Sequence, residues 1–153
     1  MAPKNTLSDL QSHLGYWMRM VSNAVSHSFA RRLDAEGVTV AEWVFLRSLY
    51  DVSDIAPSQL AERMAMTRGG VSRLADRLVA KGLVARQADP TDKRAHKLAL
   101  TPDGRKAVPK LAALADKNDE QFFGALTPNQ REQLEGLLRN IAKEHELKSA
   151  PTE

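Results

Sequence analysis

The side chains with the clearest chemical potential lie on one short segment, residues 67–81, which we predict to be a helix. A wheel at 100° per residue places arginine and serine side chains on its outer face, and these groups donate hydrogen bonds to phosphate oxygens and base edges. Two consecutive glycines open the helix, at a cost of roughly 1 kcal/mol each relative to alanine. Close approach to a DNA groove would explain that cost, whereas a solvated basic face is the alternative interpretation. The outer-face residues are Arg68, Gly69, Ser72, Arg73, Asp76 and Arg77.

Local signals mark the ends of this helix and of the helix before it. Thr67 can cap the first turn, and Gly82 is suited to end the helix. Pro57 suits the first position of a preceding helix over residues 57–64, because its missing N–H needs no partner there. The two segments therefore predict a helix-turn-helix. The inner face of the second helix must meet a core and carries Val71, Leu74, Ala75 and Leu78.

Two short strands, residues 83–87 and 96–100, follow the second helix. The connection between them contains the turn residues Asp89, Pro90 and Asp92 and a basic tip, Lys93-Arg94. Two helices followed by a hairpin with a cationic tip predict a winged helix-turn-helix.

Positive charge is confined to this part of the chain. Residues 57–109 carry eleven Lys or Arg against five Asp or Glu, a net charge of +6. Residues 1–56 carry five against six, and residues 110–153 carry six against eight. Clustered positive charge on one unit is the electrostatic footprint of a nucleic-acid surface.

Three stretches of the chain resemble the MarR (multiple antibiotic resistance regulator) family of bacterial transcription factors. They are LAERM at 60–64, TRGGVSRLADRLVAKGLV at 67–84 and DPTDKRAHKLALTPDG at 89–104, and the resemblance extends from about Leu7 to Leu147. It implies a homodimer that binds an inverted-repeat operator, most often as a repressor. One departure is Thr91, where many members carry arginine.

The rest of the chain predicts helices on either side of the winged unit. The chain of 153 residues suits a single domain, 1–153, with the winged unit at about 40–100. Helices are expected over residues 7–33, from Thr39 with a capping box to Glu42, from Thr101, and from Thr127. Pro109 should kink the third of these or break its start. The family resemblance makes residues of about 5–35 and 102–147 the dimerisation region.

The sequence argues against enzymes, metals and cofactors. It lacks the HExxH, GxSxG and Walker phosphate-loop motifs, and it contains no cysteine. His13 and His27 are fourteen residues apart on one helix, about 21 Å, so they cannot share a metal. No run of about 18 apolar residues and no apolar leader is present, so we expect a cytoplasmic protein. A winged unit that binds protein or RNA remains the alternative to a duplex-DNA reader.

Within the DNA-binding interpretation, each candidate residue has a role. Ser72 and Arg73 are expected to contact base edges, and Arg68 and Arg77 either bases or phosphates. Arg94 is expected to enter a narrow minor groove. The remaining candidates contact the backbone or allow its approach: Ser58, Thr67, Gly69, Lys93 and Lys97.

A second set of residues predicts a ligand pocket where the first helices meet the winged unit. Trp17 and Trp43 offer apolar walls, His13 and Tyr16 offer hydrogen-bonding groups, and Arg86 could pair with an anion. Taken singly, each residue is slightly better explained as core or solvated surface. As a set they suit a small aromatic carboxylate, the ligand class that the family resemblance implies.

Overall fold

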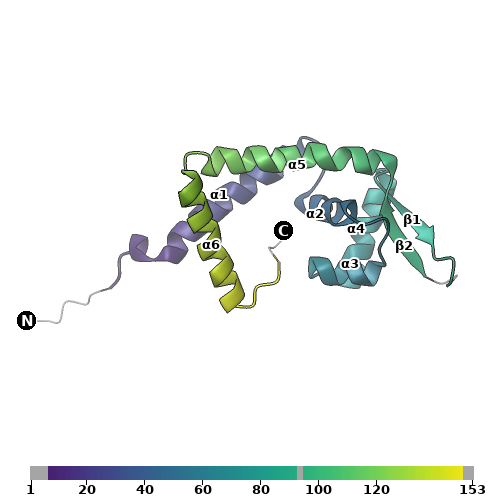
Figure 1. Cartoon of the computed structure of the whole chain (residues 1–153), viewed down its shortest axis with the longest axis horizontal. Helices are drawn as coiled ribbons and strands as arrows, with labels where there is room; N and C mark the ends of the chain where they lie inside the picture. The colour runs from purple at the N-terminus through teal and green to yellow at the C-terminus, as the bar shows by residue number, and fades with distance from the viewer. Residues whose placement is uncertain (1–6, 93–94, 150–153) are drawn as a thin grey trace, which may run out of the picture.

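The computed structural model describes residues 7–92 and 95–149 of the chain. In chain order its elements are η1 (Leu10–Ser12), α1 (Leu14–Asp34), α2 (Val40–Tyr50), α3 (Pro57–Met64), α4 (Arg68–Ala80), β1 (Val84–Ala88), β2 (His96–Leu100), α5 (Pro102–Phe123) and α6 (Pro128–Glu144). The molecule is elongated: α1, α5 and α6 form a helical arm, and α2–α4 with the β1–β2 hairpin form a winged domain (Figure 1). This arrangement confirms the predicted class, mainly helical with a β-hairpin wing. Within the described residues, no helix is long and apolar enough to cross a membrane.

Threonine caps begin four of the helices at the predicted positions. The side chains of Thr39, Thr67, Thr101 and Thr127 each accept a hydrogen bond from a backbone N–H of the first turn. Thr39 and Thr127 also complete capping boxes, so the N–H groups at these helix starts have partners.

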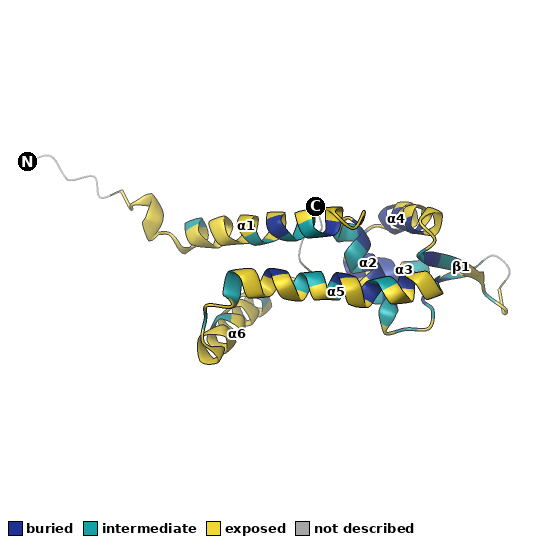
Figure 2. Ribbon diagram, turned by 90° about the horizontal axis from the view of Figure 1, so that it is seen from above, coloured by how far each residue is buried: buried dark blue, intermediate teal, exposed yellow. Residues whose placement is uncertain are grey.

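The core lies where α2, α3 and α4 meet the wing and the first half of α5 (Figure 2). The predicted inner face of α4 is confirmed, because all four of its apolar side chains are buried. They pack in one cluster with the largest side chains of the neighbouring elements, which turns this face of α4 toward the core and leaves its opposite face in solvent. The cluster includes Phe45, Leu46, Leu49, Leu60, Val71, Leu74, Ala75, Leu78 and Leu98.

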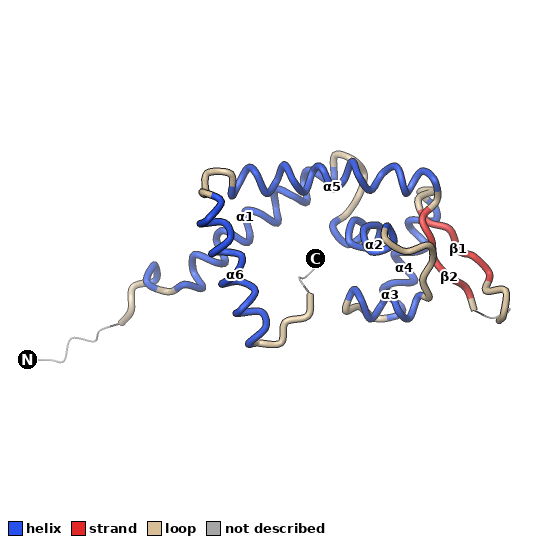
Figure 3. Tube along the Cα trace, viewed as in Figure 1, coloured by secondary structure: helices blue, strands red, loops and turns tan. Residues whose placement is uncertain are grey.

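The wing is an antiparallel hairpin with one addition that the sequence did not predict. The hairpin pairs Val84 with Leu100 and Ala88 with His96, so β1 begins one residue later than expected. Ile55, in the α2–α3 connection, exchanges two backbone hydrogen bonds with Leu98 of 3.0 and 2.8 Å. The hairpin is therefore tied to the helical core through its second strand (Figure 3).

One prediction about the arm, the start of its first helix, is wrong. The first helix was expected from Leu7, but the chain forms the short η1 and then an extended residue, His13, before α1 begins at Leu14. The indole N–H of Trp17 donates to the Gln11 carbonyl (2.9 Å), which stabilises this bend. Pro109 is predicted to kink its helix or to break its start; α5 is one continuous helix from Pro102 through Pro109, so its start is not broken.

Gly104, in the first turn of α5, lies directly against the start of the wing. A Cβ atom at this position would clash with the Leu83 carbonyl oxygen and approach its carbon to 3.0 Å. Thr101 holds the two segments together, because its backbone N–H donates to Leu83 O (3.1 Å) and its hydroxyl to Gly82 O (2.6 Å). Only glycine permits this contact between backbones.

We therefore expect Gly104→Ala to lower the free energy of unfolding by about 1–3 kcal/mol, the usual cost of overpacking. Urea denaturation measures the change. Gly69→Ala is the matched control, because a Cβ there meets only the end of the Arg73 side chain at 3.9 Å. Equal stability of Gly104→Ala and the unmodified chain would contradict the close contact.

Candidate nucleic-acid interface

The outer face of α4 is a continuous exposed surface of donors. The arginine, serine and glycine residues predicted for this face are all exposed, while the inner face is buried. Among the residues that the structure describes, none pairs with the side chains of Arg68, Arg73 or Arg77. Three unpaired guanidinium groups on one rigid helix are well suited to bind an extended anion.

The two glycines at the start of α4 have different structural reasons. A Cβ on Gly70 would approach the Met66 methyl group (3.1 Å) and the Thr67 hydroxyl (3.2 Å), so internal packing accounts for this glycine. Gly69 is exposed and open except toward Arg73. Contacts inside the chain therefore leave Gly69 unexplained, whereas close approach by an external surface would explain it.

Thr67 and Ser58 lie at the N-terminal ends of the two helices of the motif. The Thr67 hydroxyl oxygen accepts the Gly70 N–H (3.0 Å), so its first role is to cap α4. Ser58 is exposed in the first turn of α3. Both hydroxyl groups lie beside free backbone N–H groups, where phosphate oxygens bind favourably.

Ion pairs brace the wing against the helices. Arg86 donates to Asp76 on α4 (2.6 Å), which accounts for the single carboxylate on the arginine-rich face. Lys97 lies 3.4 Å from Asp54 in the α2–α3 connection. These two basic residues therefore hold β1 and β2 in place within the chain.

A compact turn leads into the tip of the wing. The backbone N–H and the hydroxyl of Thr91 both donate to Asp89 Oδ1, at 2.9 and 2.7 Å. These bonds, the backbone bond first, stabilise the carboxylate and lower the pKa of Asp89. Thr91 thus has a local role in this turn. Lys93 and Arg94, the predicted tip, lie outside the described residues.

The structure does not bring the five predicted ligand residues together within the chain. His13, Tyr16 and Trp17 lie at the outer end of α1, where the two aromatic rings meet edge to face at 5.3 Å. Trp43 packs instead on Phe29, about 18 Å further along α1, and Arg86 is on the wing. The expected pocket is therefore not one site of a single chain. Spacing along a long helix was the signal that argued against it.

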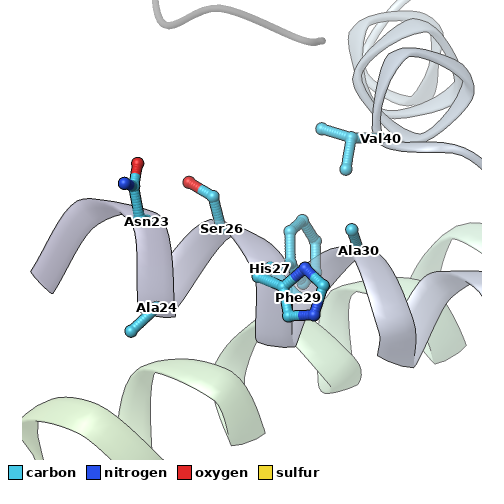
Figure 4. Close-up of a pocket in the computed structure, with 7 residues that line it drawn as sticks. All are labelled: Asn23, Ala24, Ser26, His27, Phe29, Ala30 and Val40. Carbon is cyan, nitrogen blue, oxygen red and sulfur yellow. The ribbon is translucent and has the colours of Figure 1, made fainter. Parts of the chain in front are cut away.

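A different hollow lies where α1 meets the start of α2 (Figure 4). Its volume is about 690 Å³, and its walls are side chains from residues 23–30 of α1 together with Val40. Asn23, Ser26 and His27 line it and have no side-chain hydrogen bonds to described residues, while Phe29 adds an aromatic wall. Such a mixture of apolar walls and a few polar groups is typical of a small-molecule site.

Most residues of α1 and α6 are exposed (Figure 2), and large apolar side chains are among them. α6 buries none of its residues fully, although it carries a regular apolar stripe. A contiguous apolar surface of this kind marks a site of protein contact. The exposed large apolar residues of α1 and α6 are Leu14, Trp17, Met18, Met20, Val21, Leu137, Leu138 and Ile141.

Together, the helix pair, the hairpin and the cationic face define a winged helix-turn-helix protein. Comparison with known proteins agrees, because the model of the MarR family matches residues 36–95. A Thauera aromatica protein whose proposed role is transcriptional regulation of the hcr operon is 29% identical over 136 residues, which cover 88% of this chain and 82% of that protein.

Solved structures give the same result. A variant of MarR from E. coli in complex with operator DNA has a TM-score of 0.74 and 28% identity, covering 88% of this chain and 99% of that one. BpsR from Bordetella bronchiseptica, whose DNA binding is regulated by 6-hydroxynicotinic acid, has a TM-score of 0.75 and 26% identity, covering 89% and 97%. The family-model match and these structures confirm the resemblance that the motifs indicated: the chain is similar to MarR-family transcriptional regulators. Its relatives are regulators and not enzymes.

Proposed function

We propose that this regulator binds duplex DNA sequence-specifically, with α4 in the major groove. The observation that carries the proposal is the outer face of α4, where three exposed arginines have no partner among the described residues. Ser72 and Arg73 read base edges, and Arg68 and Arg77 contact bases or phosphates. Gly69 allows the groove edge to approach the helix.

The other candidates position the protein on the DNA backbone. Ser58 and Thr67 contact phosphates at the helix N-termini, Lys93 contacts the backbone beside the wing, and Arg94 enters the adjacent minor groove. Lys97 is better placed to brace the wing through Asp54 than to contact DNA. The similar MarR variant crystallised with operator DNA supports binding of duplex DNA by this fold.

The active form is a homodimer, built by the helical arm. The exposed apolar side chains of α1 and α6 supply a self-complementary surface, and residues 1–153 act as one unit. Two symmetry-related α4 helices would then meet half-sites about one turn of DNA apart, in an inverted repeat. Occupation of such an operator in the cytoplasm represses transcription by excluding polymerase.

Binding to DNA is tested by fluorescence anisotropy with duplex DNA, single-stranded RNA and increasing salt. The protein should bind duplex DNA. The logarithm of the association constant should fall linearly with the logarithm of the salt concentration, with a slope of about −0.9 per phosphate neutralised. Preference for RNA, or no binding to either, would favour the interaction-module alternative.

A small aromatic acid is proposed to bind in the hollow between α1 and α2 and to weaken DNA binding. The unpaired Asn23, Ser26 and His27 can hydrogen-bond such a ligand beside Phe29. The BpsR structure, in which 6-hydroxynicotinic acid regulates DNA binding, supports this ligand class. The ligand can change DNA affinity only by the ratio of its affinities for the two states.

Titration with 6-hydroxynicotinic acid tests the site. In a Trp17→Phe variant the remaining tryptophan, Trp43, packs on Phe29 at the hollow and should report binding by quenching. His27→Ala should weaken binding, while Arg86→Ala should not. If His27→Ala does not change the quenching of Trp43 fluorescence, the ligand binds elsewhere. If the ligand quenches this fluorescence without lowering DNA affinity, the regulatory role is contradicted.

A further inference from the structure

A polar joint connects the C-terminal end of α4 to the start of α2. Lys81, the C-cap of α4, donates to Glu42 Oε2 and to the Gly37 carbonyl oxygen, both at 2.7 Å. Gly37 lies in the α1–α2 connection, and Glu42 lies in the first turn of α2. The ammonium group of Lys81 therefore links the C-terminal end of α4 to the α1–α2 connection and to the start of α2.

Glu42 is an unusual residue to find at such a place, because it is only 1% exposed. Its Oε2 atom also accepts the Thr39 N–H (3.3 Å) to complete the capping box. Glutamine completes a capping box equally well, so capping does not account for a buried charge. A buried ion pair gives little net stability, because desolvation offsets the attraction, but it can fix how two elements meet.

Because the joint lies at the C-terminal end of α4, a small change in its geometry moves the exposed face of the whole helix. α4 is about 20 Å long, so a tilt of about 5° at its C-terminal end displaces its N-terminal end by about 1.7 Å. A hollow of about 660 Å³ lies alongside α4, lined by Ala41 of α2, Met66 and Arg73 among others, so the outer part of α4 has open space beside it. The Lys81–Glu42 pair is the close polar link between α2 and α4 among the described residues.

We propose that Lys81 and Glu42 are positioning residues for DNA recognition. The pair sets the direction of α4 relative to α2 and so places Arg73 against its base, although neither residue contacts DNA. This inference rests on the proposed function, since it concerns how the same helix reads the same groove.

The test compares Lys81→Met, Glu42→Gln, the double variant and Lys81→Arg. Affinity is measured for a duplex selected by the unmodified protein and for a random duplex, across a range of salt concentrations. We expect each single variant to lose about tenfold affinity for the selected duplex, with random-duplex affinity and salt slope unchanged. The double variant should bind no more weakly than the weaker single variant, because the two residues act as one pair. Lys81→Arg keeps the positive charge and should retain the affinity of the unmodified protein for the selected duplex.

Controls separate this role from simpler ones. Lys110→Met removes the same charge from an exposed position on α5 and should leave selectivity unchanged. Equal losses on both duplexes with a shallower salt slope would make Lys81 a phosphate contact and overturn the proposal. A lowered melting temperature with unchanged DNA selectivity would also overturn it, because the pair would then be merely structural.

A second measurement needs no DNA. The chain contains no cysteine. A double variant with Arg31→Cys and Val79→Cys therefore offers two thiols for spin labelling, one on α1 and one on α4. Labelled chains are diluted with unlabelled ones, and pulsed electron paramagnetic resonance measures the distance within one chain. Lys81→Met should broaden or shift the distribution, and Lys110→Met should not. An unchanged distance distribution in Lys81→Met would overturn the proposal that the pair positions α4. Failure of the unmodified protein to select any duplex would overturn only the proposed function.

Discussion

Replacing Leu137 by aspartate should convert the protein to single chains and lower its affinity for the selected DNA by at least about a hundredfold. Leu137 is 62% exposed on α6, so the change removes little packing within one chain. In the proposed dimer the same position is buried against the partner. An unpaired buried charge costs about 3–5 kcal/mol, and two-fold symmetry introduces it twice.

Light scattering at micromolar concentration gives the mass, and anisotropy gives the DNA affinity. Lys143→Asp is the matched control: it changes the charge by a larger amount on the opposite face of α6 and should leave both measurements unchanged. A Leu137→Asp protein that keeps the mass of two chains and full DNA affinity would show that α6 does not form the dimer.

Arg73→Ala should cost about 1–3 kcal/mol of affinity for the selected duplex and relax the preference at one base position. The reason is that the unpaired guanidinium can make two parallel hydrogen bonds to a guanine edge, which no neighbouring residue can replace. Affinity for random duplex should change little by comparison. Competition binding with single-base variants of the site measures both effects.

Two companion variants sharpen this test. Arg31→Ala removes the same charge from an exposed site on α1 and should leave base preference intact. Gly69→Ala should keep or slightly raise the stability of α4, because alanine favours helix, yet weaken DNA binding, because its methyl group meets the groove. Equal loss on specific and random DNA after Arg73→Ala would refute the base-reading role.

Much of the winged domain follows from local signals in the sequence. The caps at Thr39 and Thr67, the buried face of α4 and the hairpin are short-range features, and the structure confirms them. The exposed outer face of α4 follows directly, since burying Val71, Leu74 and Leu78 leaves the arginines no other direction.

Features that depend on contacts distant in sequence were not predictable in the same way. The bridge from Ile55 to Leu98 and the need for glycine at position 104 arise only when separate segments meet. The predicted ligand residues have suitable chemistry, but the length of α1 separates Trp17 from Trp43, which packs on Phe29. The sequence predicts Glu42 as part of a capping box. Its ion pair with Lys81 joins residues far apart in the sequence, so only the packed structure shows it.

Selection of duplexes from a random pool by the purified protein, followed by sequencing, tests the central claim most directly. A homodimer that reads DNA with two α4 helices should enrich an inverted repeat whose half-site centres lie about one helical turn, 10–10.5 base pairs, apart. Enrichment of sites without two-fold symmetry, or no enrichment over the starting pool, would contradict a dimer that reads DNA with two α4 helices.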